Sequence, residues 1–194
     1  MISVEEALRF VLDEVTPLEV IECPVGGSVG YTLAETIVAE TPLPPFDNSA
    51  MDGYAIRTSD IEKIRPDSPV WLRIVGEVPA GSVFEKPIHP GEAVKIMTGA
   101  AVPEAADAVV MLEKARLRDG SVEIREPVPF GKHIRRKGED VSVGQEVLKG
   151  GTTIQVQHFG LLASLGRKTV RVHRAPSATL LTTGSELMYV GDSL

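Results

Sequence analysis

Two carboxylates stand five positions apart, at Asp47 and Asp52, in the segment from Pro45 to Gly53. The proline, asparagine and glycine residues of this segment favour turns over regular elements. A short acidic side chain on a fixed loop suits the positioning of a hydrated cation or a polar substrate. An Asx turn would explain Asp47 without any chemistry, and we favour that interpretation for it. Asp52, beside the flexible Gly53, is therefore the stronger functional candidate.

Thr98 and Gly99 follow an expected strand and offer a second kind of chemistry. A hydroxyl and freed backbone N–H groups at such a turn can hold an anion. Turns of this kind are common after strands, so the spacing by itself is a weak signal.

Four side chains that can carry positive charge lie between His133 and Lys137, directly before Glu139 and Asp140. A run of charges is usually a solvated face. The alternative is an oxyanion site that includes Arg135 and Arg136, with the acidic residues beside it.

The segment Thr183 to Glu186 follows an apolar run, at the place where phosphate groups commonly meet backbone donors. Glu186 could hold a metal ion that bridges such phosphates. A glutamate in the first turn of a helix, favoured by the helix dipole, explains the same residue equally well.

The elements that must position these residues are mostly strands. Ser3 and Glu6 form a capping box, which predicts a helix from about Val4 to Val15 that ends before Pro17. A proline-rich connection at 41–45 marks a boundary, 138–151 is rich in loops, and 32–39 fits either a short helix or a strand. A second short helix is expected at 157–165, with Gly166 at its C′ position. The expected strands are 70–75, 93–97, 108–112, 121–125, 168–172 and the apolar run 178–182.

The sequence therefore predicts a mainly β protein with a few short helices, followed by the first strand of a truncated α/β domain. We expect a first, discontinuous domain made of 1–44 and 138–172. Residues 45–137 would form an inserted β-rich lobe, and 173–194 would begin the α/β domain.

Composition narrows the class of protein. The 194 residues carry a net charge of −7, and a nucleic-acid partner is excluded because backbone binding needs a basic face. No apolar run reaches the length of a membrane span, and the N-terminus lacks a secretory signal. Cys23 is the single cysteine, so an internal disulfide is excluded and a reducing cytoplasm is expected. The four histidines show no metal-site spacing.

Taken together, these segments resemble one family, the molybdopterin molybdenumtransferases, which include bacterial MoeA and the E domain of gephyrin. The likeness follows the family order along almost the whole chain. It is carried by Leu33-Ala34-Glu35, Asp47 to Ala55, Ile96 to Ala100, Asp107 to Met111, Arg135 to Asp140, Leu162 to Gly166 and Thr182 to Leu187.

This resemblance implies insertion of molybdate into adenylylated molybdopterin, with a divalent cation such as Mg²⁺ and release of AMP. It implies an elongated homodimer with four subdomains, of which this chain holds the first two and the opening of the third, which binds the pterin nucleotide. A molybdopterin-adenylylating enzyme is an expected partner. The chain by itself is expected to be inactive.

Family positions carry over to Asp52, Thr98, Asp140 and Glu186 as catalytic residues, with Asp52 and Glu186 as metal ligands. Asp52 and Glu186 would orient the ion or its waters, Thr98 would contact an anionic substrate, and Asp140 would orient the basic run. Further substrate or anion contacts are expected from Ser49, Gly99, Arg135, Arg136 and Gly184. The family usually has Asp where this chain has Ser185, which removes one carboxylate from the last turn.

Two other functions stay open on the residues: a scaffold without enzymatic activity, and a β-rich module that binds anions. Joint presence of Asp52, Thr98, Asp140 and Glu186 favours the enzyme, because a scaffold does not need them together.

Overall fold

The computed structural model describes residues 2–65, 68–184, 186–188 and 190–191. The chain divides into two compact units, one made of residues 1–37 and 148–194 and the other of residues 38–147. The second unit extends beyond the range 45–137 expected for the inserted lobe, because its two connecting segments bond to each other. The N–H of Ala39 donates to the carbonyl of Gln145 at 2.9 Å, and that of Leu43 to Val141 at 2.8 Å.

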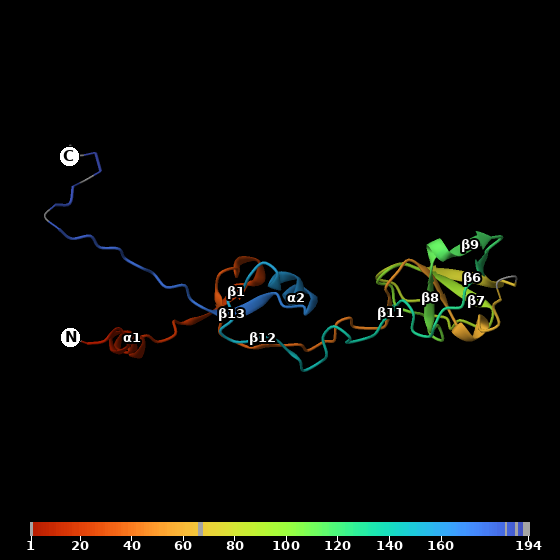
Figure 1. Cartoon of the computed structure of the whole chain (residues 1–194), viewed down its shortest axis with the longest axis horizontal. Coiled ribbons are helices and arrows are strands. Elements are labelled where there is room, and N and C mark those ends of the chain that lie inside the picture. Colours follow the sequence, from red (N-terminus) through yellow and green to blue (C-terminus); the bar gives the residue numbers. More distant parts are fainter. Residues whose placement is uncertain (1, 66–67, 185, 189, 192–194) are drawn as a thin grey trace. The chain divides into compact units, whose positions relative to one another are not determined.

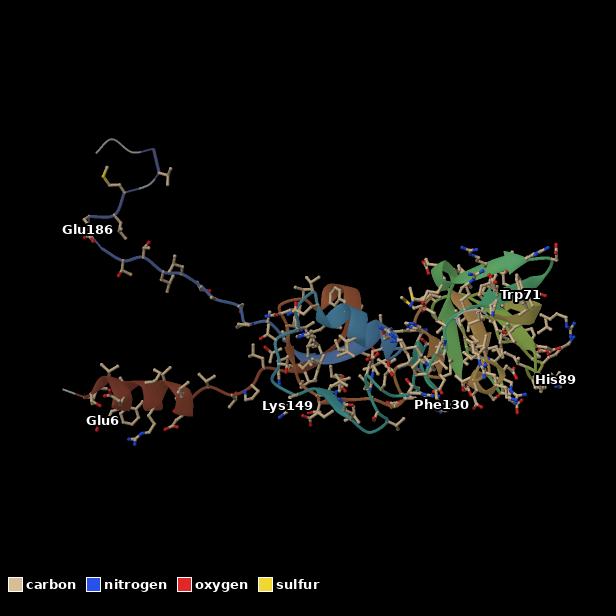
Figure 2. All side chains as sticks on the ribbon, turned by 45° about the vertical axis from the view of Figure 1, so that its right-hand side comes forward. Glu6, Trp71, His89, Phe130, Lys149 and Glu186 are labelled. Atoms are coloured by element: carbon tan, nitrogen blue, oxygen red, sulfur yellow. The ribbon has the colours of Figure 1, made fainter. Side chains whose placement is uncertain are left out.

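Helix α1 (Val4–Asp13) begins as its capping box predicts. The Ser3 hydroxyl accepts the Glu6 N–H at 3.1 Å, and the Glu6 carboxylate accepts the Ser3 N–H at 2.9 Å. None of its residues is buried, and side chains project from both sides of its ribbon near Glu6 (Figure 2). Its apolar residues are therefore exposed, among them Val4, Leu8, Val11 and Leu12.

The first unit is built on a three-stranded antiparallel sheet in the order β1-β13-β2 (Figure 1). Its strands are β1 (Val20–Pro24), β2 (Thr32–Leu33) and β13 (Thr169–His173), with a short helical turn, η1 (Val25–Gly27), after β1. Helix α2 (His158–Ser164) buries Leu162 and ends, as predicted, with Gly166 in the left-handed conformation, φ 73°. Buried aliphatic residues of this unit include Leu33, Ile154, Leu162, Val170 and Val172.

The second unit contains a six-stranded sheet in the order β8-β5-β7-β6-β10-β9. Neighbouring strands are antiparallel except β6 and β7, which are parallel with an irregularity between Ile74 and Gly76. The strands are β5 (Gly53–Ile56), β6 (Val70–Val78), β7 (Glu92–Ile96), β8 (Ala108–Met111), β9 (Ala115–Arg118) and β10 (Ser121–Ile124).

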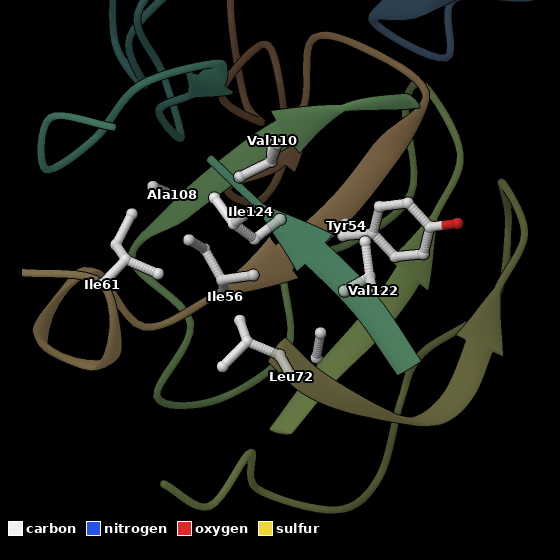
Figure 3. Close-up of a cluster of buried hydrophobic side chains, with 9 residues drawn as sticks. Tyr54, Ile56, Ile61, Leu72, Ala108, Val110, Val122 and Ile124 are labelled. Atoms are coloured by element: carbon white, nitrogen blue, oxygen red, sulfur yellow. The ribbon is translucent and has the colours of Figure 1, made fainter. Parts of the chain in front are cut away.

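Side chains alternate between the two faces of this sheet, as the period of a strand requires. Tyr54 and Ile56 of β5 enter one apolar cluster with Leu72, Val122 and Ile124 (Figure 3). Ala55, between them, enters a second cluster on the opposite face. Because β5 is buried on both faces, it shows no apolar–polar alternation, and the sequence did not single it out as a strand.

Short pairs of strands complete the chain. β4 (Asn48–Ser49) pairs with β11 (Ile134–Arg135), and β3 (Ile37–Val38) pairs with β12 (Glu146–Leu148). Two helical turns, η2 (Thr58–Asp60) and η3 (Leu112–Lys114), follow β5 and β8. The undecided segment 32–39 therefore contains the two short strands β2 and β3 rather than a helix.

The expected strand at residues 178–182 does not form: these residues have no regular structure. Leu180 and Leu181 are 91% and 82% exposed. A strand needs a neighbour for its backbone hydrogen bonds, and these residues are hydrogen-bonded to no other strand. The class expected from the sequence, mainly β with few helices, is nevertheless confirmed: the described residues contain two α-helices and are otherwise built on strands. No helix in the described part of the chain is long and apolar enough to cross a membrane.

Candidate functional site

Asp52 and Thr98 form the centre of the candidate site. The Thr98 N–H and the Thr98 hydroxyl both donate to Oδ1 of Asp52, each at 2.7 Å. The sheet explains this meeting, because β5 and β7 pair antiparallel with Gly53 opposite Ile96. Asp52 directly precedes β5 and Thr98 follows β7, so the register brings the two residues to one edge.

Hydrogen bonding also sets the charge of Asp52. The bonds from the Thr98 hydroxyl and backbone lower the pKa of the Asp52 carboxyl, and the charge of Lys95 lowers it further. Lys95 itself pairs with Glu77 at 3.0 Å. The site therefore holds an ionised carboxylate at neutral pH.

The turn at Thr98 presents oxygen atoms rather than donors. The Thr98 hydroxyl donates its single proton to Asp52, so it can only accept a hydrogen bond from a ligand. The backbone N–H groups are also committed: Thr98 to Asp52, Gly99 to the Ser49 carbonyl at 2.8 Å, and Ala100 to Met97 at 3.0 Å. The expected anion contacts of Thr98 and Gly99 are therefore not supported, and this edge suits a cation or a hydrogen-bond donor.

Ser49 has a structural role in this loop, in place of the contact with substrate that we expected. It is fully buried, and its hydroxyl donates to the Met51 carbonyl at 2.5 Å and accepts the Met51 N–H at 3.2 Å. Its backbone N–H donates to the Ala100 carbonyl at 3.0 Å. Ser49 thus joins the loop that carries Asp52 to the turn that carries Thr98.

Arg136 is held by Asp47. The Arg136 guanidinium contacts Asp47 Oδ2 at 2.6 Å, and the Lys137 N–H donates to Asp47 Oδ1 at 2.8 Å. These bonds lower the pKa of the Asp47 carboxyl, the Lys137 N–H being the largest cause and the Arg136 side chain the next. The Arg136 guanidinium also lies 5.7 Å from the centre of the Phe130 ring, which is labelled in Figure 2.

Asp140 does not orient the basic run as expected. Its side chain is exposed, and its backbone N–H donates to the Leu43 carbonyl at 3.0 Å. Glu139 takes that part instead, because its carboxylate accepts the Arg136 N–H at 2.7 Å. The Asx turn favoured for Asp47 is also wrong, since both of its side-chain oxygens bond across the lobe.

Arg135 is a cation of this run that stays available, as is the side chain of Lys137, whose backbone N–H alone binds Asp47. Arg135 lies on β11 opposite Asn48, next to the strand that carries Ser49. It is exposed, and within the described part of the chain its guanidinium forms no ion pair. β4 thus has Arg135 opposite it on one side and the Gly99–Ala101 segment on the other, through a bridge between Asn48 and Ala101.

Gly184 and Glu186 lie in the other unit, in a segment without helix or strand. Gly184 has φ 156°, and a side chain at this position would lie 2.2 Å from the Glu186 carboxylate in its present conformation. Ser185, which replaces the family's usual Asp, lies outside the described residues. Among the described residues no group of three or more His, Cys, Asp or Glu side chains could hold a metal. A metal shared by Asp52 and Glu186 stays a prediction.

Comparison with known protein families shows the family to which this chain belongs. Residues 2–166 match the family model described as the MoeA N-terminal region, domains I and II. The chain belongs to this MoeA N-terminal family. The match includes Asp52, Thr98, Arg135, Arg136 and Asp140, and it ends before Gly184 and Glu186.

Curated relatives and solved structures of the MoeA type agree with this family. The chain is 37% identical over 193 residues to the molybdopterin molybdenumtransferase of Staphylococcus aureus strain MSSA476, covering 100% of this chain and 46% of that protein. It is 40% identical over 194 residues to molybdopterin molybdenumtransferase 2 of Mycobacterium tuberculosis strain CDC 1551, covering 100% of this chain and 48% of that protein. The crystal structure of the molybdopterin biosynthesis MoeA protein from Pyrococcus horikoshii OT3 matches with a TM-score of 0.83 and 38% identity, over 89% of this chain and 46% of that one. The chain thus spans about half the length of these relatives.

Within this MoeA-type lobe, the sequence did not predict the contacts of Asp47, for which it favoured a local Asx turn. Its partners Arg136 and Lys137 are 89 and 90 positions away, beyond any local turn pattern. Two features of the sequence could have indicated this contact. Asp47 was a carboxylate without an assigned partner, and the segment from His133 to Lys137 had more cations than nearby carboxylates.

Proposed function

We propose that this chain contributes to molybdenum cofactor biosynthesis by helping to insert molybdate into adenylylated molybdopterin, with release of AMP. Family membership and the names of the relatives support the pathway. The single observation that carries the proposal is the Asp52–Thr98 pair, an ionised carboxylate and a hydroxyl that together present oxygen atoms.

Magnesium fits this donor set. Mg²⁺ prefers oxygen ligands and is usually held by one or two carboxylates, water and substrate phosphates rather than by a cage of side chains. A lone carboxylate such as Asp52 is sufficient for that mode. When bound, such an ion would supply Lewis-acid stabilisation of charge that develops on phosphate oxygens.

The residues of this chain would have separate roles in the proposed reaction. Asp52 holds the ion or its water, and Thr98 fixes the carboxylate through two bonds to Oδ1. Arg135, exposed on β11, attracts the oxyanion. Arg136, neutralised by Asp47, keeps the loop in place rather than binding substrate. Gly184 and Glu186 would add contacts to phosphate and metal, and Asp140 stays a candidate only through its exposed carboxylate.

We propose further that the functional protein is a homodimer in the cytoplasm and receives its substrate from a molybdopterin-adenylylating enzyme. The exposed apolar residues of α1 support association, because a helix with such residues gains by covering them. Sedimentation of the chain with and without Leu8→Glu tests the homodimer. A monomer at all concentrations in the unsubstituted chain would contradict it.

A chimaera tests the proposed reaction. Residues 1–194 replace the matching part of the Mycobacterium tuberculosis relative, which is 40% identical over the same 194 residues. We expect AMP release that depends on both molybdate and Mg²⁺. Asp52→Asn should lower the rate by about 100-fold, a typical loss for removal of one electrostatic group at a reacting centre.

Asp119→Asn is the matched control, because it removes a carboxylate from an exposed turn of the same lobe. A chimaera that melts cooperatively yet releases no AMP would contradict the proposed function. Equal rates in the Asp52 and Asp119 variants would contradict the part given to Asp52.

A further inference from the structure

A cavity of about 240 Å³ lies in the second unit between β8 and the segment that follows β10. Val109, Val110 and Ile124 form the apolar floor of the cavity, although each of them is at most 3% exposed. Val128 and the prolines at 127 and 129 continue this apolar lining. Small-molecule sites have this composition, an apolar body with a few polar groups.

The polar groups of the cavity are mainly cationic. Lys114, Lys132 and His133 line it, with Glu126 as the only acidic lining residue among those described. Lys114 contacts Glu126 at 3.1 Å, but both side chains are well exposed, 60% and 70%, so their attraction is weak. Lys132 forms no ion pair with any described residue, and its charge is therefore available to a ligand.

The backbone holds Lys132 against β8 and His133 against the residue that follows β4. The Val109 N–H donates to the Lys132 carbonyl at 3.0 Å, and the Ala50 N–H donates to the His133 carbonyl at 2.9 Å. His133 has φ 59°, in the left-handed region that residues other than glycine seldom adopt. Conformations of this kind occur where the surroundings impose them, often at ligand sites.

The pKa of His133 is lowered, so its imidazole is neutral at neutral pH. Burial lowers the pKa of its imidazole most, and the charges of Lys132 and Lys114 lower it further. Both ammonium groups therefore act on the same ring at the cavity wall. Like charges gathered on one wall repel each other, and an anion placed among them relieves that repulsion.

We propose that this cavity binds a small organic anion, with its charged head at Lys132 and Lys114, beside the His133 imidazole, and its apolar body against Val128 and the prolines at 127 and 129. The aliphatic wall excludes a bare inorganic ion as the best ligand, because such an ion gains nothing from apolar contact. The cationic side excludes a neutral molecule as the best ligand, because a molecule without charge gains little from contact with the lysines. This site is separate in its residues from the Asp52–Thr98 pair.

Binding of phenyl phosphate and benzoate, followed by backbone amide shifts of the chain, is the direct test. We expect saturable shifts at residues 109, 128 and 133 for at least one of the two anions, and their relative affinities distinguish a phosphate head from a carboxylate head. Benzyl alcohol and inorganic phosphate should each bind at least about tenfold more weakly, because each lacks one half of the required chemistry.

Two substitutions at the cavity should act in opposite directions. Lys132→Gln should weaken binding about tenfold, the value of one charge-assisted contact. Glu126→Gln should tighten it about threefold, because Lys114 then loses its competing partner. Lys63→Gln, an exposed lysine of the same unit that does not line the cavity, is the control and should change nothing.

No saturable shift with either anion at millimolar concentration would overturn the proposal. So would equal weakening by Lys132→Gln and Lys63→Gln, or inorganic phosphate that binds as tightly as phenyl phosphate. Because all three substituted side chains are exposed, the variants should keep the amide spectrum of the folded chain.

Discussion

Asp47 and Arg136 are 89 positions apart in sequence, yet their side chains meet at 2.6 Å. Asp47 lies where the chain enters the six-stranded sheet, and Arg136 lies where it leaves. The Lys137 N–H binds the second oxygen of the same carboxylate at 2.8 Å. This carboxylate therefore ties the entry and the exit of the lobe together.

The first prediction concerns this tie. A double-mutant cycle with Asp47→Asn and Arg136→Gln should show a coupling free energy of about 0.5 kcal/mol, since both side chains are partly exposed, 39% and 47%. The asparagine oxygen can still accept the Lys137 N–H, so the cycle isolates the charge. Chemical denaturation at low and high salt measures it, and the coupling should shrink at high salt. A coupling that is unchanged by salt would show that the contact is not electrostatic.

Asp52→Asn should leave the fold almost unchanged while it removes the charge of the site. The amide oxygen of asparagine can accept both bonds from Thr98, which now reach Oδ1 of Asp52. Its thermal midpoint should stay close to that of the unsubstituted chain, and the amide shifts that we expect Mg²⁺ to cause near Thr98 should be lost. A large fall in the midpoint would show instead that Asp52 is mainly structural.

Thr98→Val should raise the pKa of Asp52 toward its ordinary value of 3.8, because the hydroxyl bond is the largest cause of the lowering. Thr98→Ser keeps the hydroxyl and is the matched control. Titration of the Asp52 carboxyl carbon by NMR measures both variants.

The sign of the accompanying stability change follows from linkage. A carboxyl with a lowered pKa in the folded state stabilises the fold above its unfolded pKa, and this contribution is lost as the pH falls through the folded pKa. The stability difference between the unsubstituted chain and Thr98→Val should therefore be present at neutral pH and narrow below pH 3.8. A difference that grows in acid would contradict this assignment.

Gly53→Ala should be strongly destabilising. A Cβ atom at this position would lie 2.0 Å from the Val110 carbonyl oxygen, a backbone atom that cannot move aside without disturbing β8. We expect a loss of about 1–3 kcal/mol in the free energy of unfolding, the range for forced overpacking. Gly26→Ala is the control, because nothing lies within 4 Å of its added Cβ. Similar unfolding curves for the two variants would mean that β5 and β8 separate more easily than their close approach indicates.

Local chemistry in the sequence was sufficient for several features of this protein. The Ser3–Glu6 capping box determined the start of α1, and Gly166 determined the end of α2, because both act through bonds or dihedral angles within one turn. Strand-like apolar runs separated by proline and glycine turns indicated β6, β7, β8 and β10. The motif around Asp52 and Thr98 also identified the region of the site.

Only the tertiary structure decided what those site residues do. Thr98 directs its proton to Asp52, 46 positions away, and this leaves the turn with acceptor oxygens in place of the donors expected for an anion. Ser49 is buried, and Asp47 and Glu139 rather than Asp140 hold Arg136 of the basic run. The apolar run at 178–182 forms no strand, because a strand exists only through bonds to a neighbour. Hydrogen bonds and strand pairing are relations between distant residues, and the residue types alone do not specify which partner each donor finds.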